Sequence, residues 1–447
     1  MIFTEPQIES LSPNPAAFTA GKKLSSKSNW LKLAKNDRAV WGEIKGSGSS
    51  PYKTQIDINS IVYKCSCPSR QFPCKHTIAL MLLCASSEKE FNSSVDEPEW
   101  VTNWIEKRQN KAIEPGKKVG RTEEDQAKLD KAREKTQADR FDSVTAGVAE
   151  LELWLKDMIR IGILELPNKP ASDFEKVAAR MVDAKAPGLA GWVKSLTKLD
   201  FVKPDEWQTE ALKILSKLYL IIKTFQNYNN LTPIWQTTIK NLVGWNQSTK
   251  ELLADKEAEC VKDKWLLAGQ EMETMDDIDV QRNWLVGCSS NRRALILNFV
   301  TKFSVIENPL LPGSVIEAEL SFFPSVTPNR AVIKMQRSVS DVLDQNPQSF
   351  NLWNDVLEYR AEQLRLNPWA NDHLVLLKDA RLYKSDSLWI VYDAEKNYMP
   401  VVVGFNLEKM ITWLAITGNG ASTVGLVLRN DKVLPLGLFQ HNKYILL

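Results

Sequence analysis

Residues 65–76 of the chain read Cys65-Ser66-Cys67-Pro68-Ser69-Arg70-Gln71-Phe72-Pro73-Cys74-Lys75-His76, which places three of the six cysteines and one of the three histidines in a C-x-C-x6-C-x-H spacing. Three cysteines and one histidine are one of the ligand sets that hold zinc in structural sites, where four thiolate or imidazole groups form a closed tetrahedron. Such a site leaves no position for a substrate. We therefore predict that Cys65, Cys67, Cys74 and His76 bind a structural zinc ion that stabilises the local fold and performs no chemistry.

The four ligands divide into two pairs on different local elements. Alternate residues of a strand share a face, so Cys65 and Cys67 can approach one ion from the end of a strand. The segment between the pairs has a proline at each end, and proline opposes both a helix and a continuing strand ladder, which predicts a loop. The apolar run from residue 77 to residue 85 predicts a short buried helix that docks over the site, with His76 at or near its first turn.

Disulfide bonding and cysteine catalysis are the alternatives to zinc. A disulfide requires an oxidising compartment, whereas Cys84, Cys260 and Cys288 are dispersed in apolar or helical surroundings, as buried thiols usually are. The other histidines, His373 and His441, have no cysteine near them in the sequence. Zinc is favoured, and redox use or chance clustering of the cysteines remains the alternative.

Alternating apolar residues lead into the ligands. The runs Val40–Ile44 and Tyr52–Ile58 flank a glycine- and serine-rich turn and predict a hairpin, and residues 61–64 continue toward the first ligand. A small sheet that leads into C-x-C, followed by C-x-H at the start of a helix, resembles the SWIM zinc finger. The residues that match the bacterial SWIM zinc finger family are Trp41-Gly42-Glu43, Gly46-Ser47-Gly48, Pro51-Tyr52, Ile56-Asp57, Cys65-Ser66-Cys67-Pro68-Ser69 and Cys74-Lys75-His76.

The resemblance covers about the first 110 residues and, more weakly, residues 178–189. It implies zinc binding and a role in binding nucleic acid or protein. Bacterial members of the family are associated with MoxR-type AAA+ ATPases and with von Willebrand A domain proteins. The resemblance therefore implies a protein of one of these kinds as a partner.

The formal net charge is only +2 at pH 7, so no overall positive field points to nucleic acid. Residues 1–91 are locally basic, with twelve Lys or Arg against seven Asp or Glu. The candidates for a DNA- or RNA-binding face are Lys22, Lys23, Lys27, Lys32, Lys35 and Arg38 before the hairpin, and Lys64, Arg70 and Lys75 around the ligands. An ordinary solvated surface is equally consistent with this pattern.

The sequence predicts a multidomain α+β protein with a small β-hairpin/helix zinc finger, a central helical bundle and a C-terminal mixed α+β domain. Residues 1–104 form the zinc-binding module. Residues 105–140 are rich in charge and predict a mobile linker, within which residues 123–140 can form a solvated helix. Apolar residues at three- and four-residue steps predict helices in 141–290, and a change of period predicts strands and helices in 291–447.

Within the last segment, strands are expected at 295–300, 315–320, 331–335, 388–392, 399–405 and 423–428, and a helix at 342–366. The tryptophans there are scattered, which favours core packing and anchoring between elements over a base-stacking platform. Before it, the acidic residues Glu271, Glu273, Asp276, Asp277 and Asp279 lack the glycine and spacing of a calcium loop. We expect a solvated helix end or loop at that position.

Three classes of function remain. A non-enzymatic adaptor or scaffold is favoured because most of the chain lies outside the finger. The first alternative is a DNA- or RNA-binding protein, and the second is a nuclease or transposase-like enzyme, although the chain has no Gly-rich phosphate loop, H-E-x-x-H or G-x-S-x-G motif. No stretch approaches 18 apolar residues and the start lacks a basic segment before an apolar one, so we expect a cytoplasmic protein without membrane contact. The oligomeric state is left open.

Overall fold

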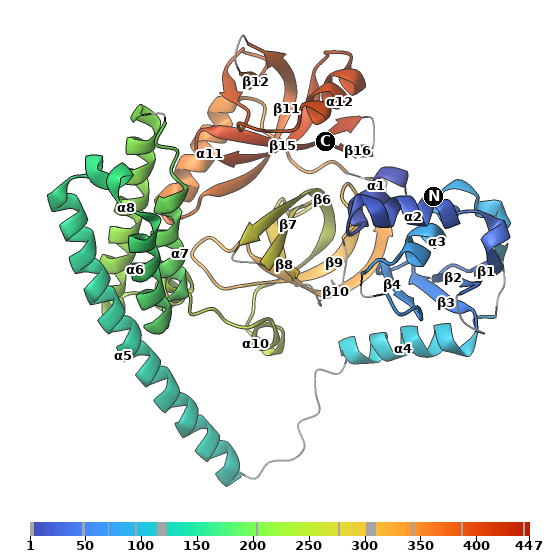
Figure 1. Cartoon of the computed structure of the whole chain (residues 1–447), viewed down its shortest axis with the longest axis horizontal. Helices are drawn as coiled ribbons and strands as arrows, with labels where there is room; N and C mark the ends of the chain where they lie inside the picture. The colour runs from blue at the N-terminus through green and yellow to red at the C-terminus, as the bar shows by residue number, and fades with distance from the viewer. Residues whose placement is uncertain are drawn as a thin grey trace.

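The computed structural model describes residues 4–46, 50–69, 71–93, 96–113, 123–202, 204–275, 278–300, 310–340, 343, 345–385, 388–440 and 443–447. Its helices and strands form an N-terminal finger module, a helical bundle and two β-sheets, which confirms the multidomain α+β class (Figure 1). The finger module and the bundle lie on different sides of the sheets (Figure 1). In the part of the chain that is described, no helix is long and apolar enough to cross a membrane.

The finger module is a five-stranded sheet between two helical layers. Its elements are α1 (Glu5–Leu11), α2 (Pro15–Leu24), β1 (Trp30–Lys35), β2 (Ala39–Ile44), β3 (Tyr52–Asp57), β4 (Val62–Cys65), α3 (Lys75–Ser86), β5 (Asn92–Ser93) and α4 (Glu99–Ile113). The strand order is β4-β3-β2-β1-β5, and β2 and β3 form the predicted hairpin. Because successive strand residues point to opposite faces, Val40 packs with α3 whereas Trp41 packs against Ile105 of α4.

The helical region contains the predicted bundle and ends at residue 254. Its helices are α5 (Glu123–Ile161), α6 (Ala171–Asp183), α7 (Pro187–Ser195), α8 (Pro204–Gln226), α9 (Pro233–Val243) and α10 (Thr249–Ala254). Apolar side chains at the predicted steps, such as Val144 and Leu218, are buried, whereas Leu212 is exposed. Helices α7 and α9 approach closely at Gly188, where a Cβ would collide with the carbonyl oxygen of Leu242.

The described residues of the charged segment 105–140 are helical. Helix α4 continues to Ile113, and α5 begins at Glu123 and enters the bundle without a break. The solvated helix predicted for 123–140 is thus the first part of a 39-residue helix. It continues because no proline interrupts residues 123–161, and the one glycine there, Gly147, does not break the helix. The rest of the predicted linker, residues 114–122, lies outside the described residues.

Residues 260–447 form two sheets that pack against each other. The first contains β6 (Cys260–Met275), β7 (Ile278–Gly287), β8 (Arg293–Val300), β9 (Val315–Phe322) and β10 (Ala331–Ser340) in the order β10-β9-β6-β7-β8. The second contains β11 (Asp372–Lys384), β12 (Trp389–Tyr392), β13 (Tyr398–Pro400), β14 (Ser422–Arg429), β15 (Lys432–Gln440) and β16 (Lys443–Leu446) in the order β13-β12-β11-β14-β15-β16, with helices α11 (Trp353–Leu366) and α12 (Leu407–Thr417). Leu266, Trp284, Leu374 and Val427 belong to the core that the two sheets share.

The structure corrects three predictions in this region. Residues 260–275 and 278–287 were expected to be helical, but they form β6 and β7. The sequence lacks the alternation of a half-exposed strand here because Trp265–Ala268 is buried on both faces of β6. The helix expected from residue 342 begins at Trp353. The strand expected at 399–405 ends at Pro400, and a turn at residues 403–404, where Gly404 has a φ of +80°, ends the extended run. The other five expected strands lie within β8, β9, β10, β12 and β14, apart from Leu388, which immediately precedes β12.

The finger and the bundle are both docked on the sheets. Leu311, between β8 and β9, is 1% exposed and belongs to the same core as Ile8 and Leu80 of the finger. Trp369, between α11 and β11, is buried in the bundle core, and its Nε1 donates a hydrogen bond to the carbonyl oxygen of Lys217 at 3.0 Å. The finger is therefore not the freely tethered module that the charged linker predicted, because its core is completed by a distant residue.

Candidate metal centre

The four predicted ligands come from β4, α3 and the loop between them. Cys65 is the last residue of β4, Cys67 follows two residues later, Cys74 is the N-cap of α3, and His76 lies in the first turn of that helix. All four side chains are buried, and Cys74 is only 1% exposed. The apolar residues 78–84 of α3 pack onto the sheet, which holds the start of the helix over the end of β4.

The ligand atoms of these residues all lie within 4.8 Å of one another. Nδ1 of His76 lies 3.8 Å from Sγ of Cys65 and 4.0 Å from Sγ of Cys74. A tetrahedral zinc ion with Zn–S bonds of about 2.3 Å and a Zn–N bond of about 2.0 Å places its ligand atoms roughly 3.5–3.8 Å apart. The group therefore fits a zinc ion bound through Nδ1 of His76, with four protein ligands and no open position.

Two threonine hydroxyls support the sulfur atoms. Oγ1 of Thr54 lies 3.2 Å from Sγ of Cys65, and Oγ1 of Thr77 lies 3.4 Å from Sγ of Cys74. Both threonines are 0% exposed. A hydroxyl that donates to a thiolate orients the ligand and reduces its charge, as outer partners do in metal sites. Sequence reasoning missed both residues, although Thr54 is the register partner of Cys65 across β3 and β4.

The buried thiols of the site shift one another's pKa. Hydrogen bonding between the Cys65 and Cys74 sulfurs raises the pKa of Cys65 and lowers the pKa of Cys74. Burial raises the pKa of Cys67. Zinc binds thiolates, so the ion must displace the protons that these groups hold. Metal binding should therefore release protons and weaken as the pH falls.

The remaining cysteines and histidines lie elsewhere. Cys84 is buried in the finger core, Cys288 is buried between the two sheets, and Cys260 is exposed. His373 is buried on β11, and His441 lies outside the described residues. Within the described ranges, the Cys3His group is the one cluster of cysteine, histidine and carboxylate side chains with the geometry to hold a metal ion.

A cleft of about 930 Å³ lies beside the ligands, and we call it the finger cleft. Its lining includes Ala17 and Leu24 of α2, Lys45, Tyr52, Lys75 and His76. Two lysines and no carboxylate among the described residues line it, and apolar side chains of α2 form one wall. The cleft therefore offers a positively charged and partly apolar surface next to the metal ligands.

Eight of the nine basic residues predicted as nucleic-acid contacts lie in the described part of the chain. Lys22, Lys23, Lys27, Lys32, Lys64 and Lys75 are exposed, Lys35 and Arg38 are half-buried, and Arg70 lies outside the described residues. Of the described ones, only Lys75 lines the finger cleft. Arg38 forms an ion pair with Glu97, and Lys22 forms one with Glu5. Part of the local positive charge is therefore neutralised within the finger module.

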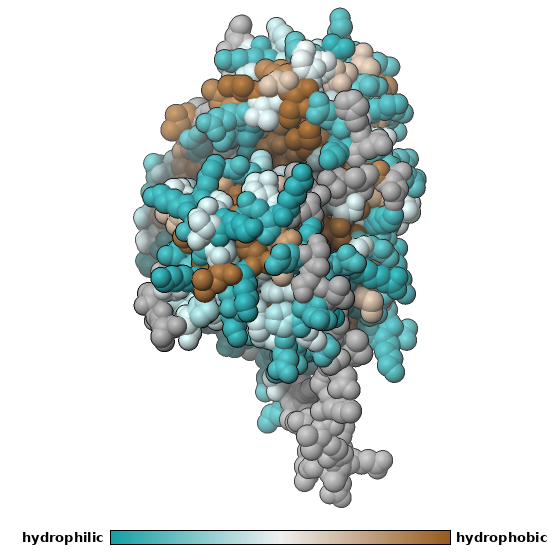
Figure 2. Space-filling model, turned by 90° about the vertical axis from the view of Figure 1, so that its right-hand side faces the viewer, coloured by the Kyte–Doolittle hydropathy of each residue, from teal (hydrophilic) through white to brown (hydrophobic). Residues whose placement is uncertain are grey.

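Figure 2 shows the side of the molecule on which the finger module lies. Hydrophilic and apolar residues are interspersed over most of this face, and a larger apolar area lies near its top. The C-terminal domain, which is uppermost in Figure 1, exposes 70% of Val403, 57% of Leu407 and 55% of Ile411. Leu407 and Ile411 are four residues apart on α12 and share one face of that helix.

The acidic residues of β6 and β7, in the first sheet, differ from the prediction. Glu271 and Glu273 lie on β6 and Asp279 lies on β7, so these residues are in strands and not in a helix end or loop. Asp276 and Asp277 lie outside the described residues. The pairing of β6 with β7 continues to Met275 and Ile278, so the backbones of all three acidic residues belong to the ladder.

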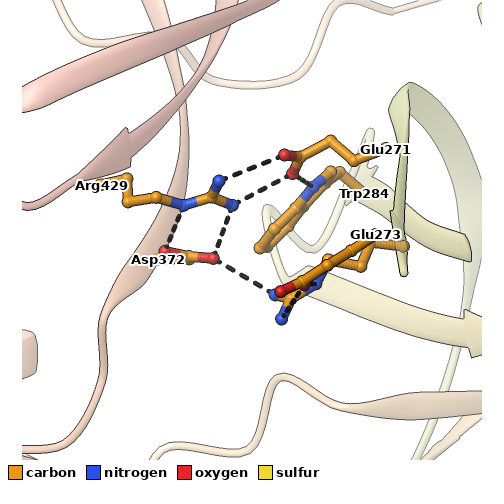
Figure 3. Close-up of polar contacts among 6 residues, drawn as sticks. Glu271, Glu273, Trp284, Asp372 and Arg429 are labelled. Carbon is orange, nitrogen blue, oxygen red and sulfur yellow. Dashed lines mark hydrogen bonds and ion pairs between the residues drawn. The ribbon is translucent and has the colours of Figure 1, made fainter. Parts of the chain in front are cut away.

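Two members of this run belong to an ion-pair network between the sheets, shown in Figure 3. Arg429 of β14 donates to Glu271 at 3.2 Å and to Asp372 of β11 at 2.8 Å. Arg282 of β7 pairs with Glu273 at 3.0 Å and with Asp372 at 3.3 Å. The negative charges of these carboxylates are therefore met by guanidinium groups from the two sheets.

Two domain families match the chain. Residues 52–85 match the SWIM zinc finger, and residues 139–243 match the SWIM-associated four-helix bundle domain. The first match spans β3, β4 and most of α3 with all four ligands, and the second spans the C-terminal part of α5 through α9. No curated protein and no solved structure matches the chain. Both matches confirm the resemblance that the ligand spacing indicates, and the second includes the weakly similar residues 178–189.

Proposed function

We propose that this SWIM zinc finger protein, which also carries the four-helix bundle that accompanies the finger, is a non-enzymatic adaptor or scaffold. One observation carries the proposal: a buried and closed Cys3His group lies directly beside the open finger cleft. A zinc ion with four protein ligands has no position for a substrate, so its role is to hold the surface around it. The cleft is that surface, and a partner would bind there.

The chemistry of the finger cleft favours an acidic segment of a partner protein. Lys45 and Lys75 line the cleft, and the apolar wall of α2 can pack against side chains of an extended peptide. The exposed apolar face of α12 offers a second contact for a large partner, because exposed apolar patches often mark protein interfaces. We further propose a MoxR-type AAA+ ATPase or a von Willebrand A domain protein as the partner, on the association of the family alone.

Binding of DNA or RNA is the alternative function. The exposed residues Lys23 and Lys27 and the cleft residues Lys45 and Lys75 favour it. The pairing of Arg38 with Glu97 and of Lys22 with Glu5 weakens it, because these cations already have partners. Nucleic-acid binding would show a strong loss of affinity with added salt.

A cryptic nuclease or transposase-like activity is the second alternative, and it has the least support. Such enzymes use carboxylates that hold divalent cations. In this protein, Glu271, Glu273 and Asp372 are paired with Arg282 and Arg429. Among the described residues, no carboxylate cluster has metal-binding geometry.

Affinity purification of the full-length protein from its native cells tests the proposal. Samples at low salt, with and without nuclease, would be compared for the wild type and for Lys45→Glu/Lys75→Glu, with Lys89→Glu/Lys107→Glu as the control for exposed charges outside the finger cleft. Protein partners that survive nuclease and are lost only from the cleft variant support the adaptor. Nucleic acid retained without protein supports the alternative, and equal recovery of partners by all three proteins removes the finger cleft from the proposal.

A further inference from the structure

A second cleft, of about 430 Å³, lies between the turn of the β7–β8 hairpin and the α11–β11 segment. We call it the Arg293 cleft, and its polar lining includes Asn291, Arg292, Arg293, Tyr359, Gln363 and His373. Small-molecule sites typically have volumes of about 300–1,000 Å³ and combine an apolar wall with a few polar groups. This cleft has that size and composition, and it is far in the chain from the Cys3His group.

The guanidinium group of Arg293 lies in this cleft without a counter-charge. One of its nitrogens, Nη1, donates to the backbone carbonyl oxygen of Asn291, whereas Nε is inaccessible to solvent and has no hydrogen-bond partner. Its Cζ atom lies 5.6 Å from the ring centre of Tyr359 and 5.9 Å from that of Phe350. No carboxylate pairs with Arg293 anywhere in the described ranges, and burial lowers its pKa.

The carboxylates that line the same cleft are engaged elsewhere. Glu259 forms an ion pair with Arg292, and Asp372 is shared by Arg282 and Arg429. Of the two arginines that line the cleft, Arg292 is therefore balanced by a carboxylate and Arg293 is not. A buried charge without a partner is costly to a fold, and proteins usually pair or neutralise it.

His373 provides a second polar group that lacks a partner. Its side chain is 6% exposed, it lines the Arg293 cleft, and its Nε2 has no hydrogen-bond partner. Its ring meets the ring of Tyr359 edge-on, with 6.2 Å between the centres. Buried polar atoms are satisfied in most native structures, so two unsatisfied atoms on residues that line one cleft mark it as a candidate site for a polar ligand.

We propose that the Arg293 cleft binds the anionic group of a small molecule, a carboxylate or a phosphate monoester, with Arg293 as its counter-charge. A guanidinium group presents paired N–H donors that match two oxygens of either anion. The centres of the Phe350 and Tyr359 rings lie 5.9 and 5.6 Å from the guanidinium carbon, and His373 lines the same cleft. This binding site is independent of the finger cleft and goes beyond the adaptor function.

The test uses the full-length, zinc-loaded protein with inorganic phosphate and succinate as probes, in buffers of equal ionic strength made up with chloride. Isothermal calorimetry and thermal unfolding would compare the wild type with Arg293→Met, and with Arg337→Met as the control, because Arg337 lies on β10 and does not line the cleft. We expect the wild type and the control to bind at least one probe and to unfold at a higher temperature in its presence. In Arg293→Met the affinity should fall about tenfold or more.

A response to phosphate and not to succinate identifies a phosphate site, and the reverse identifies a carboxylate site. In chloride alone, Arg293→Met should unfold at a temperature equal to or above that of the wild type, because it no longer holds a half-buried and uncompensated charge. Arg293→Lys, which keeps the charge without the planar fork, should bind with intermediate affinity and serves if the methionine variant does not fold. Equal responses of wild type, Arg293→Met and Arg293→Lys, or no binding of either probe to the wild type, would overturn the proposal.

Discussion

Replacement of Trp369 by alanine should release the helical bundle from the sheets. Trp369 belongs to the connection between α11 and β11, yet it is 7% exposed within the bundle core and lies edge-on to Trp235, with 6.2 Å between the ring centres. Burial of about 200 Å² of a tryptophan at about 25 cal/mol per Å² contributes about 5 kcal/mol. Truncations of buried tryptophan to alanine cost about 3–5 kcal/mol, so we expect a loss of about 4 kcal/mol from the contact between the two modules.

Urea unfolding followed by far-UV circular dichroism, together with limited proteolysis, would measure this loss. In the wild type, the bundle and the sheets should unfold in one transition, and in Trp369→Ala the bundle should unfold first. The matched control is Trp389→Ala, because Trp389 is half-buried on β12 and packs within the C-terminal domain, away from the bundle. If Trp369→Ala loses less than about 1 kcal/mol and keeps a single transition, Trp369 does not anchor the bundle.

Three further outcomes are expected. Cys67→Ser should lose zinc and unfold the finger, whereas Cys84→Ser should keep the metal. Native mass spectrometry would measure the zinc content, and stoichiometric zinc in Cys67→Ser/Cys74→Ser would contradict the ligand assignment. Gly188→Ala should lower the free energy of unfolding by on the order of 2 kcal/mol, as thermal unfolding would measure, because it forces α7 away from α9. The control Gly191→Ala, on the same helix, meets no atom and should be neutral or slightly stabilising. Equal effects of the two changes would refute the close approach. Burial, and then the charge of Arg360, lowers the pKa of His373 from 6.5 to about 4, so stability that is present above about pH 6.5 should be lost as the pH falls toward 4. His373→Gln should flatten that part of the pH dependence of urea unfolding, and an unchanged slope would rule out this contribution.

The metal ligands could be predicted from the sequence because all four lie within residues 65–76, so their spacing alone fixes the geometry. The supporting hydroxyl of Thr54 was missed because its approach to Cys65 depends on the register of two strands. The pairing of Arg38 with Glu97 was missed for a similar reason, since 59 residues separate the two in the chain. The sequence therefore indicated Arg38 as a free surface cation, whereas the structure pairs it with Glu97.

The fold was predictable where one periodicity dominates and not where burial is two-sided. Amphipathic steps identified the helices around Val144 and Leu218, whose side chains face one core. The strand residues 265–268 are buried on both faces, so their apolar run is compatible with either a helix or a strand. The positions of Leu311 and Trp369 depend on contacts between modules, which no local pattern encodes.

The place of Leu311 in the finger core has a consequence for the order of events during protein synthesis. All four metal ligands have left the ribosome soon after residue 76 is made, and N-terminal domains usually fold first. The core that supports them still lacks one of its buried side chains until residue 311 has been made. The nascent finger therefore passes through a long interval in which it can take up metal while its packing is incomplete, and its maturation finishes only after most of the chain has been translated.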